Sequence, residues 1–171
     1  DKYLNRINKS VDRLIYLVKD LDMISELERD RINIELTTFN LTALVQDVID
    51  LLEIKEKKNN IKLTLNYPIH QPIKVIGDIQ KIEQVLINLI VNAINYSNPN
   101  TEVVIDFDDF DNQIQISIKD QGVGIKQEDL ERVFERFYRV DKSRNRNNGG
   151  SGLGLAIVKH ILEAHQQKIY V

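Results

Sequence analysis

The chain has 171 residues, 42% of them hydrophobic, and a net charge of −3 at pH 7, which accommodates one well-buried domain with a short appendage rather than two full domains. It contains no cysteine, so disulfides, thiolate metal sites and cysteine nucleophiles are excluded, and its charge provides no basic field for nucleic acid. No apolar run reaches the ~18 residues of a membrane-spanning helix, and the N-terminus lacks a signal-peptide layout, so we expect a soluble chain.

The first 30 residues predict one long amphipathic helix that ends near Leu27. Because a single helix cannot bury its own apolar seam, this helix is expected to pair with others. The charged cluster at residues 28–31 closes it and predicts a domain boundary near residue 30. The seam residues alternate steps of three and four, as in a coiled coil or helix bundle: Leu4, Ile7, Val11, Leu14, Val18 and Leu21.

The middle of the chain alternates helical and extended patterns. Asn40 is predicted to cap a helix that ends at Asn60, with Phe39 and Leu44 forming a hydrophobic staple around the cap. Asp78 is the equivalent start signal for a second long helix. The expected elements are a strand over 32–39, a helix over 40–60, strands over 61–67 and 73–76, and a helix over 78–97.

The C-terminal part predicts a hairpin, polar loops and a final helix. Helices interspersed with antiparallel strands predict an α+β fold, an α/β sandwich in which helices cover one face of a mixed sheet. The expected elements are strands over 101–110 and 113–119, a short helix over 127–137, a lid-like polar tract over 141–152, a helix over 153–165 and the start of a strand over 168–171.

Six of the seven glycines lie in two clusters, at residues 120–124 and 149–154. The second cluster runs directly into a predicted helix, whose unpaired N–H groups and dipole suit phosphate oxygens; a flexible glycine-rich loop is the alternative for this cluster alone. No Gly-Lys-Ser/Thr follows, which excludes the phosphate loop of P-loop NTPases. Leu155 and Ile157 stand where a dinucleotide-binding loop needs its last glycine, which excludes that loop as well.

Four sequence blocks, weak one by one, form a specific set in this order and at this spacing. The blocks are Asn-Leu-Ile-Val-Asn-Ala-Ile-Asn-Tyr at 88–96, Asp-Gln-Gly-Val-Gly at 120–124, Val-Phe-Glu-Arg-Phe-Tyr-Arg-Val-Asp at 133–141 and Gly-Ser-Gly-Leu-Gly-Leu at 150–155. The first block places two amides one turn apart on one helix face. Together the four resemble the N box, first glycine box, F box and second glycine box of the ATP-binding catalytic domain of sensor histidine kinases.

This resemblance covers the whole chain and implies its domain organisation. Residues 30–171 would form the catalytic domain, of the Bergerat-type ATP-binding fold with its closing strands truncated. Residues 1–29 would form the second helix of the dimerising hairpin that carries the phosphoacceptor. None of His70, His160 and His165 stands in the His-Glu context of a phosphoacceptor, so the acceptor is expected upstream of this chain.

The resemblance also implies roles for the residues of the N box and first glycine box. Asp120 would accept a hydrogen bond from the adenine amino group, and Tyr96 would line the adenine pocket. Gly122 and Gly124 would let the loop turn tightly. Asn92 would bind Mg²⁺ through its side-chain oxygen, a hard ligand that suits a cation bridging phosphates.

Further implied roles concern the phosphates. Asn88 would lie near the metal or the phosphates, and Arg139 would reach the terminal phosphate and offset its charge during transfer. Asn95 departs from the family pattern, because a lysine that helps to hold phosphates usually stands there. Backbone N–H groups offered to the phosphates would come from Gly150, Gly152, Leu153 and Gly154.

The implied activity is transfer of the γ-phosphoryl group of Mg-ATP to a histidine on the upstream hairpin. Implied partners are a second copy of the chain, joined through the N-terminal helix, and the receiver domain of a response regulator, with no nucleic acid. The domain would be cytoplasmic and its parent anchored in the bacterial inner membrane.

Three alternatives share the ATP-binding fold. A gyrase-like or chaperone-like ATPase is disfavoured, because Asn88 replaces the glutamate that activates water. A catalytically silent nucleotide-sensing or dimerisation module is favoured only by Asn95. A serine-directed protein kinase fits less well with the bundle helix at residues 4–27.

Overall fold

The computed structural model describes residues 33–67, 72–110, 113–140 and 151–171, with scattered positions between residues 3 and 28. The chain divides into two compact units, one of residues 34–127 and one of residues 1–33 with 128–171. Every described position from Tyr3 to Glu28 is helical. The described seam residues Ile7, Val11, Leu14, Val18 and Leu21 are between 46% and 64% exposed, as expected of an apolar seam that needs a partner.

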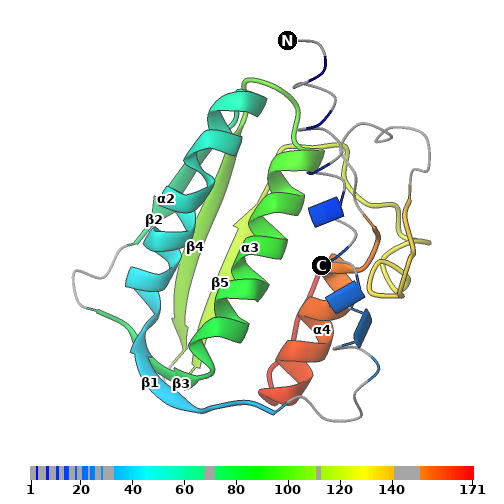
Figure 1. The fold of residues 1–171 in the computed structure, drawn as a ribbon. Coiled ribbons are helices and arrows are strands. Elements are labelled where there is room, and N and C mark those ends of the chain that lie inside the picture. Colours follow the sequence, from blue (N-terminus) through cyan, green and yellow to red (C-terminus); the bar gives the residue numbers. More distant parts are fainter. Residues whose placement is uncertain are drawn as a thin grey trace. The chain divides into compact units, whose positions relative to one another are not determined.

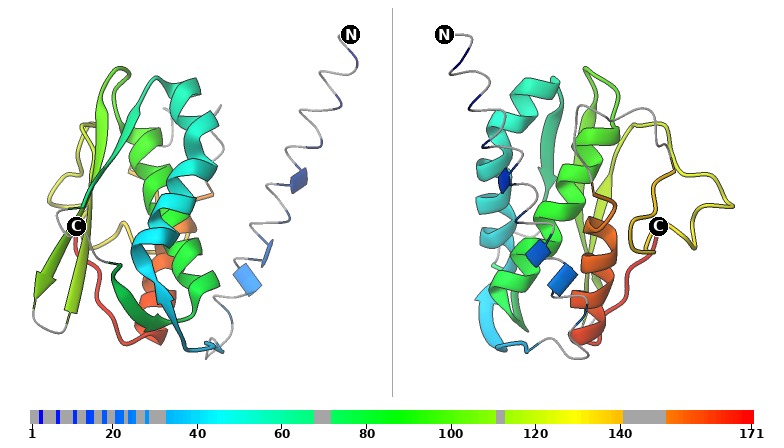
Figure 2. Two further views of the ribbon diagram at one scale, coloured as in Figure 1. Left: turned by 90° about the vertical axis from the view of Figure 1, so that its left-hand side faces the viewer. Right: turned by 45° about the vertical axis from the view of Figure 1, so that its right-hand side comes forward.

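The unit of residues 34–127 confirms the predicted mixed sheet with helices on one face. Strand β2 runs parallel to β4, β4 runs antiparallel to β5, and β1 pairs with β3 in a separate antiparallel ribbon. Helices α2 and α3 lie side by side over one face of the β2–β4–β5 sheet (Figures 1 and 2). The elements are β1 Thr37–Asn40, α2 Leu41–Asn59, β2 Lys62–Asn66, β3 Lys74–Gly77, α3 Ile79–Tyr96, β4 Glu102–Phe110 and β5 Gln113–Lys119.

Side-chain caps fix where the two helices of this unit begin, as the sequence predicts. The Asn40 side chain accepts a hydrogen bond from the backbone N–H of Ala43, at 3.4 Å. The Asp78 carboxylate accepts two, from the backbone N–H groups of Gln80 and of Lys81 in the first turn of α3, both at 3.1 Å. Each cap satisfies donors that would otherwise lack a partner.

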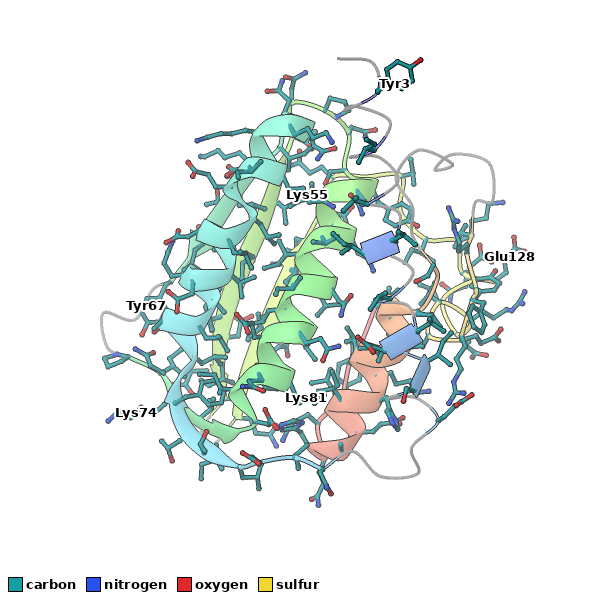
Figure 3. The ribbon with its side chains drawn as sticks, viewed as in Figure 1. Tyr3, Lys55, Tyr67, Lys74, Lys81 and Glu128 are labelled. Atoms are coloured by element: carbon teal, nitrogen blue, oxygen red, sulfur yellow. The ribbon has the colours of Figure 1, made fainter. Side chains whose placement is uncertain are left out.

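The core lies between the sheet and the two helices. Alternate residues of β4 are almost fully buried, with Val103 and Ile105 at 0% exposure, because successive strand side chains point to opposite faces. Tyr67 follows β2 (Figure 3). Its ring packs edge-on against that of Phe107, with the ring centroids 5.7 Å apart. The opposite face of the sheet is polar; there Asp106 pairs with Lys119 at 2.9 Å.

The part of the second unit after residue 127 contains one regular element among its described residues, helix α4 at Gly154–Ala164. The predicted final helix over 153–165 is therefore confirmed to within one residue at each end. The predicted lid over 141–152 falls mostly outside the described residues, since only positions 151 and 152 belong to them.

Three predicted elements differ from the structure. The strand expected from residue 32 begins only at Thr37, where pairing with Gly77 starts. The strand expected over 168–171 is wrong, because no described residue pairs with this segment and a strand requires a hydrogen-bonding neighbour.

The helix predicted over residues 127–137 is also wrong, because these residues form consecutive turns. The backbone N–H of Arg132 bonds to the carbonyl of Asp129 at 2.9 Å, and that of Glu135 bonds to the carbonyl of Arg132 at 2.8 Å. The backbone then turns into the left-handed region at Phe137, with φ 64°. Nucleating a helix is costly for so short a segment, so tertiary contacts decide its path.

Candidate functional site

The residues of the predicted N box lie on the C-terminal half of α3. Asn88, Asn92 and Asn95 follow one another at intervals of four and three, so they share a helix face. The fully or nearly buried residues Leu86 and Ile90 mark the opposite side of the helix, toward the core. All three asparagines are half-buried, so their amides are accessible from outside the core.

The Asn88 side chain is oriented by its own helix. Its amide nitrogen donates to the backbone carbonyl of Gln84 at 3.0 Å, which leaves the amide oxygen as the group that a ligand or cation can use. Sequence reasoning placed Asn88 and Asn92 on one face, and the structure confirms that placement. Their roles toward metal and phosphates stay predictions.

The first glycine loop is joined directly to the end of α3. Ser97 and Gly122 form an isolated antiparallel bridge, and the Asn98 side chain donates to the carbonyl of Gln121 at 3.0 Å. A Cβ on Gly122 would lie 2.3 Å from the carbonyl oxygen of Tyr96, far inside contact distance. The structure therefore brings Tyr96 beside the loop that follows Asp120. Position 122 requires glycine because the Tyr96 carbonyl leaves no room for a side chain.

Gly124 needs glycine for a different reason. Its φ is +69°, which side-chain-bearing residues rarely adopt, while nothing surrounds the position within 4 Å. The predicted tight turn is thus present, and its two glycines contribute to it differently.

Asp120 is exposed and already has a structural contact. One carboxylate oxygen accepts the backbone N–H of Gly122 at 2.8 Å, which closes the turn into the loop. A carboxylate retains further lone pairs, so it can still accept a hydrogen bond from a ligand amino group. The turn-capping role is observed, whereas the predicted adenine contact remains a prediction.

In the other unit, the F box and the second glycine block are joined through their backbones. The Phe137 N–H donates to the Gly152 carbonyl at 3.0 Å. Gly152 has φ +77°, and a Cβ there would lie 2.9 Å from the Phe137 carbonyl carbon. Phe137 itself is 61% exposed, so the two blocks meet here through their backbones.

Two of the remaining phosphate-binding candidates, Leu153 and Gly154, lie at the start of α4. Leu153 is the N-cap residue and has no side-chain capping bond, so the first N–H groups of the helix, including that of Gly154, lack a side-chain cap. Its side chain is fully buried. Arg139 is half-buried, and Gly150 lies outside the described residues.

One cluster in this unit was missed by sequence reasoning. The Tyr138 hydroxyl donates to the Asp129 carboxylate, and the Arg132 guanidinium lies 4.1 Å from the centre of the Tyr138 ring. Tyr138 lies six residues after Arg132 and nine after Asp129, not the three or four that bring side chains together on a helix, so the helical pattern predicted for this segment could not have identified the contact.

The described residues show two negative features that bear on the site. No group of three or more His, Asp or Glu side chains in them is placed to hold a metal ion. None of their helices has the length and apolar character needed to cross a bilayer.

Comparisons with known proteins agree on one family. Residues 77–171 match the family described as histidine kinase-, DNA gyrase B- and HSP90-like ATPases. Sensor histidine kinase WalK of Bacillus subtilis (strain 168) is 36% identical over 171 residues, an alignment that covers 99% of this chain and 28% of WalK. The chain thus spans little more than a quarter of that relative.

Solved structures show the same likeness. Histidine kinase ThkA, in complex with the response regulator protein TrrA, matches with a TM-score of 0.75 and 32% identity over 99% of this chain and 46% of that one. Full-length ShkA, in complex with AMPPNP, matches with a TM-score of 0.81 and 25% identity over 95% of this chain and 33% of that one. The family match, the N box on α3 and the glycine loop fixed to its end lead to one conclusion: this chain belongs to the family of histidine kinase-, DNA gyrase B- and HSP90-like ATPases.

Proposed function

We propose that this chain is the catalytic part of a sensor histidine kinase, which binds Mg-ATP and supplies the γ-phosphoryl group that the full-length protein transfers to a histidine. The proposal is carried by the junction of Tyr96 with the loop of Asp120 and Gly122, which places the N box beside the first glycine box. The relative ShkA was solved with an ATP analogue, which supports a nucleotide as the ligand.

Asp120 would recognise the adenine base. The carboxylate oxygen that does not close the turn would accept a hydrogen bond from the adenine amino group, and the Tyr96 ring, which is partly exposed, would line the base. A guanine base carries a carbonyl at this position, and a carboxylate cannot donate to it. The site would therefore prefer ATP over GTP.

The oxygen donors on α3 fit a magnesium ion. Asn92 would bind it through its amide oxygen, and the Asn88 oxygen is left available by the bond of its nitrogen to Gln84. Magnesium keeps several waters and is usually held by one or two protein oxygens together with substrate phosphates. When bound, it would bridge the phosphates and reduce their charge.

Arg139 and the second glycine block would bind the phosphates of the same nucleotide. The first N–H groups of α4 lack a side-chain cap and would donate hydrogen bonds to phosphate oxygens. Arg139 would place its guanidinium at the terminal phosphate, where charge changes during transfer. No residue here needs to activate water, in agreement with an asparagine at position 88.

The phosphoacceptor would lie on a hairpin whose second helix is formed by residues 1–29, the domain boundary being near residue 30. The exposed seam of Ile7, Val11 and Leu14 would pair in a homodimer. ThkA was solved with a response regulator protein, and we propose such a regulator as the partner that receives the phosphoryl group. A parent anchored in the bacterial inner membrane, with this domain in the cytoplasm, is part of the same proposal.

A base-exchange experiment tests the adenine contact. The Asp120→Asn variant keeps an oxygen for the Gly122 N–H but presents an NH₂ donor to the adenine amino group. We expect ATP affinity to fall by roughly tenfold to a hundredfold, equivalent to about 1.5–3 kcal/mol. The preference over GTP should be lost, because guanine accepts from the new donor, while circular dichroism stays native.

Matched controls define the outcomes of this experiment. Asp109→Ala, at an exposed aspartate on β4, should change neither affinity. Asn92→Ala should remove the magnesium dependence of ATP binding without reversing the base preference. Full ATP-over-GTP discrimination in folded Asp120→Asn would remove Asp120 from the adenine site.

Asn95 favours one rival function, a silent nucleotide-sensing module. A lysine introduced by Asn95→Lys should tighten ATP binding more than adenosine binding, because a new cation acts only on the charged phosphates. The gain should shrink at high salt. Absence of phosphoryl transfer in the full-length protein, despite normal Mg-ATP binding, would favour the silent module.

A further inference from the structure

Tyr138 is held from two sides by side chains of the preceding turns. Its hydroxyl donates to the Asp129 carboxylate, and the Arg132 guanidinium lies over the face of its ring, 4.1 Å from the centre. The Arg132 Nε is in turn 3.4 Å from a carboxylate oxygen of Glu135. We name Asp129, Arg132 and Tyr138 the Tyr138 clamp.

The residue before Tyr138 is held through its backbone. Phe137 has φ 64°, a conformation that a bulky residue adopts only when its surroundings impose it. Burial of the side chain does not impose it, since that side chain is mostly exposed. We attribute this conformation to two contacts: the hydrogen bond from the Phe137 N–H to the Gly152 carbonyl at 3.0 Å, and the adjacent clamp on Tyr138.

Stability alone does not account for the clamp. The Arg132 and Glu135 side chains are 53% and 54% exposed, and exposed charged contacts of this kind contribute little to folding free energy. Their effect is geometric, because a ring held at its hydroxyl and over its face has few orientations left. The backbone that leaves Tyr138 leads directly to Arg139.

We propose that Tyr138 is a positioning residue for the phosphoryl-transfer reaction: the clamp fixes the backbone from which Arg139 reaches the terminal phosphate. This inference rests on the proposed function and assigns a role to three residues outside the glycine and asparagine motifs. Fixing Tyr138 reduces the conformational freedom that Arg139 must lose in the transition state. The clamp contributes to the rate of transfer and leaves ground-state nucleotide binding nearly unchanged.

The test compares single substitutions in the full-length protein. Tyr138→Phe removes only the hydroxyl bond, Asp129→Ala removes its acceptor, and Asp129→Asn restores an oxygen acceptor. Tyr170→Phe makes the same chemical change at a tyrosine that is 78% exposed and serves as the matched control. The rate of phosphoryl transfer at saturating ATP and the Kd of an ATP analogue are measured for each.

We expect Tyr138→Phe and Asp129→Ala each to lower the transfer rate roughly tenfold, as a small misplacement of a catalytic group does. The Kd of the ATP analogue should change by less than about twofold, and Asp129→Asn should recover most of the transfer rate. The double variant that combines Tyr138→Phe with Asp129→Ala should be no slower than either single variant, because both remove the same hydrogen bond. Tyr170→Phe should match the unmodified protein.

Several outcomes would overturn the inference. Tyr138→Phe that transfers at the unmodified rate, or Asp129→Asn that is as slow as Asp129→Ala, would show that the hydroxyl bond positions nothing. A change in Kd as large as the change in rate would assign Tyr138 to binding. If Arg139→Ala slows transfer while Tyr138→Phe does not, only this inference fails; if the unmodified protein transfers no phosphoryl group, the proposed function fails with it.

Discussion

The glycines of the two clusters look alike in the sequence, but individual positions require glycine for different physical reasons. In the first, Gly122 is crowded by the Tyr96 carbonyl, whereas Gly124 has a positive φ and open space around it. In the second, Gly152 combines a positive φ of +77° with a backbone neighbour 2.9 Å from a Cβ position. Gly122 and Gly152 each lie against a backbone segment distant in sequence, whereas Gly124 does not. Alanine substitutions at the three positions should therefore lower the free energy of unfolding by different amounts.

Gly122→Ala should be the most damaging of the alanine substitutions. The added Cβ would meet the Tyr96 carbonyl oxygen at 2.3 Å, and that oxygen belongs to the last residue of a helix that cannot move alone. We expect the free energy of unfolding to fall by about 3 kcal/mol or more, measured by urea denaturation. A loss below about 1 kcal/mol would mean that the loop can detach from α3 at little cost.

Gly152→Ala should cost about 2–3 kcal/mol, from the left-handed conformation and the contact with Phe137 together. Its specific signature should be local. Hydrogen exchange at the Phe137 amide should accelerate, because that N–H bonds to the Gly152 carbonyl. Unchanged protection at Phe137 would show that the two boxes are held together by other contacts.

Gly124→Ala should be milder, at about 1–2 kcal/mol, because only the positive φ opposes it. Gly124→Asn should cost less than Gly124→Ala, since asparagine tolerates the left-handed region better. The same denaturation measurement applies. If Gly124→Ala and Gly124→Asn lower the free energy of unfolding equally, the positive φ at position 124 is not what opposes the substitution. The difference drawn between Gly124 and the crowded glycines would then be wrong.

The smallest expected effect concerns pH. The hydrogen bond to Asp129 raises the pKa of Tyr138 above its ordinary value, so the native state holds the phenol proton more tightly than the unfolded state does. The associated stabilisation is fully present below the ordinary tyrosine pKa of about 10 and is lost as pH rises through the higher native pKa.

Ultraviolet absorbance titration checks this shift. The absorbance change that is missing in Tyr138→Phe belongs to the Tyr138 phenol. This phenol should ionise at higher pH in the unmodified protein than in Asp129→Ala. Coincident titration curves in the two proteins would mean that the hydroxyl bond is absent in solution. That outcome would also mean that the Tyr138 clamp does not hold the backbone beside Gly152.

The sequence alone determined the helices and the core strands of residues 34–127. Asn40 and Asp78 are caps that act on their nearest backbone N–H groups, and the alternation along β4 depends only on strand geometry. Such signals are local, so they need no knowledge of the fold. The shared face of Asn88 and Asn92 follows from the helical period in the same way.

Contacts between residues distant in sequence were decided only by the tertiary structure. Gly122 meets Tyr96, and Phe137 meets Gly152, across intervals that no periodic pattern encodes. The turns at 127–137 replace the predicted helix, because Asp129 bonds to Tyr138 and a short helix has too few internal bonds to compete. The segment 168–171 forms no strand among the described residues, since strand propensity becomes structure only when a neighbouring strand supplies the hydrogen bonds.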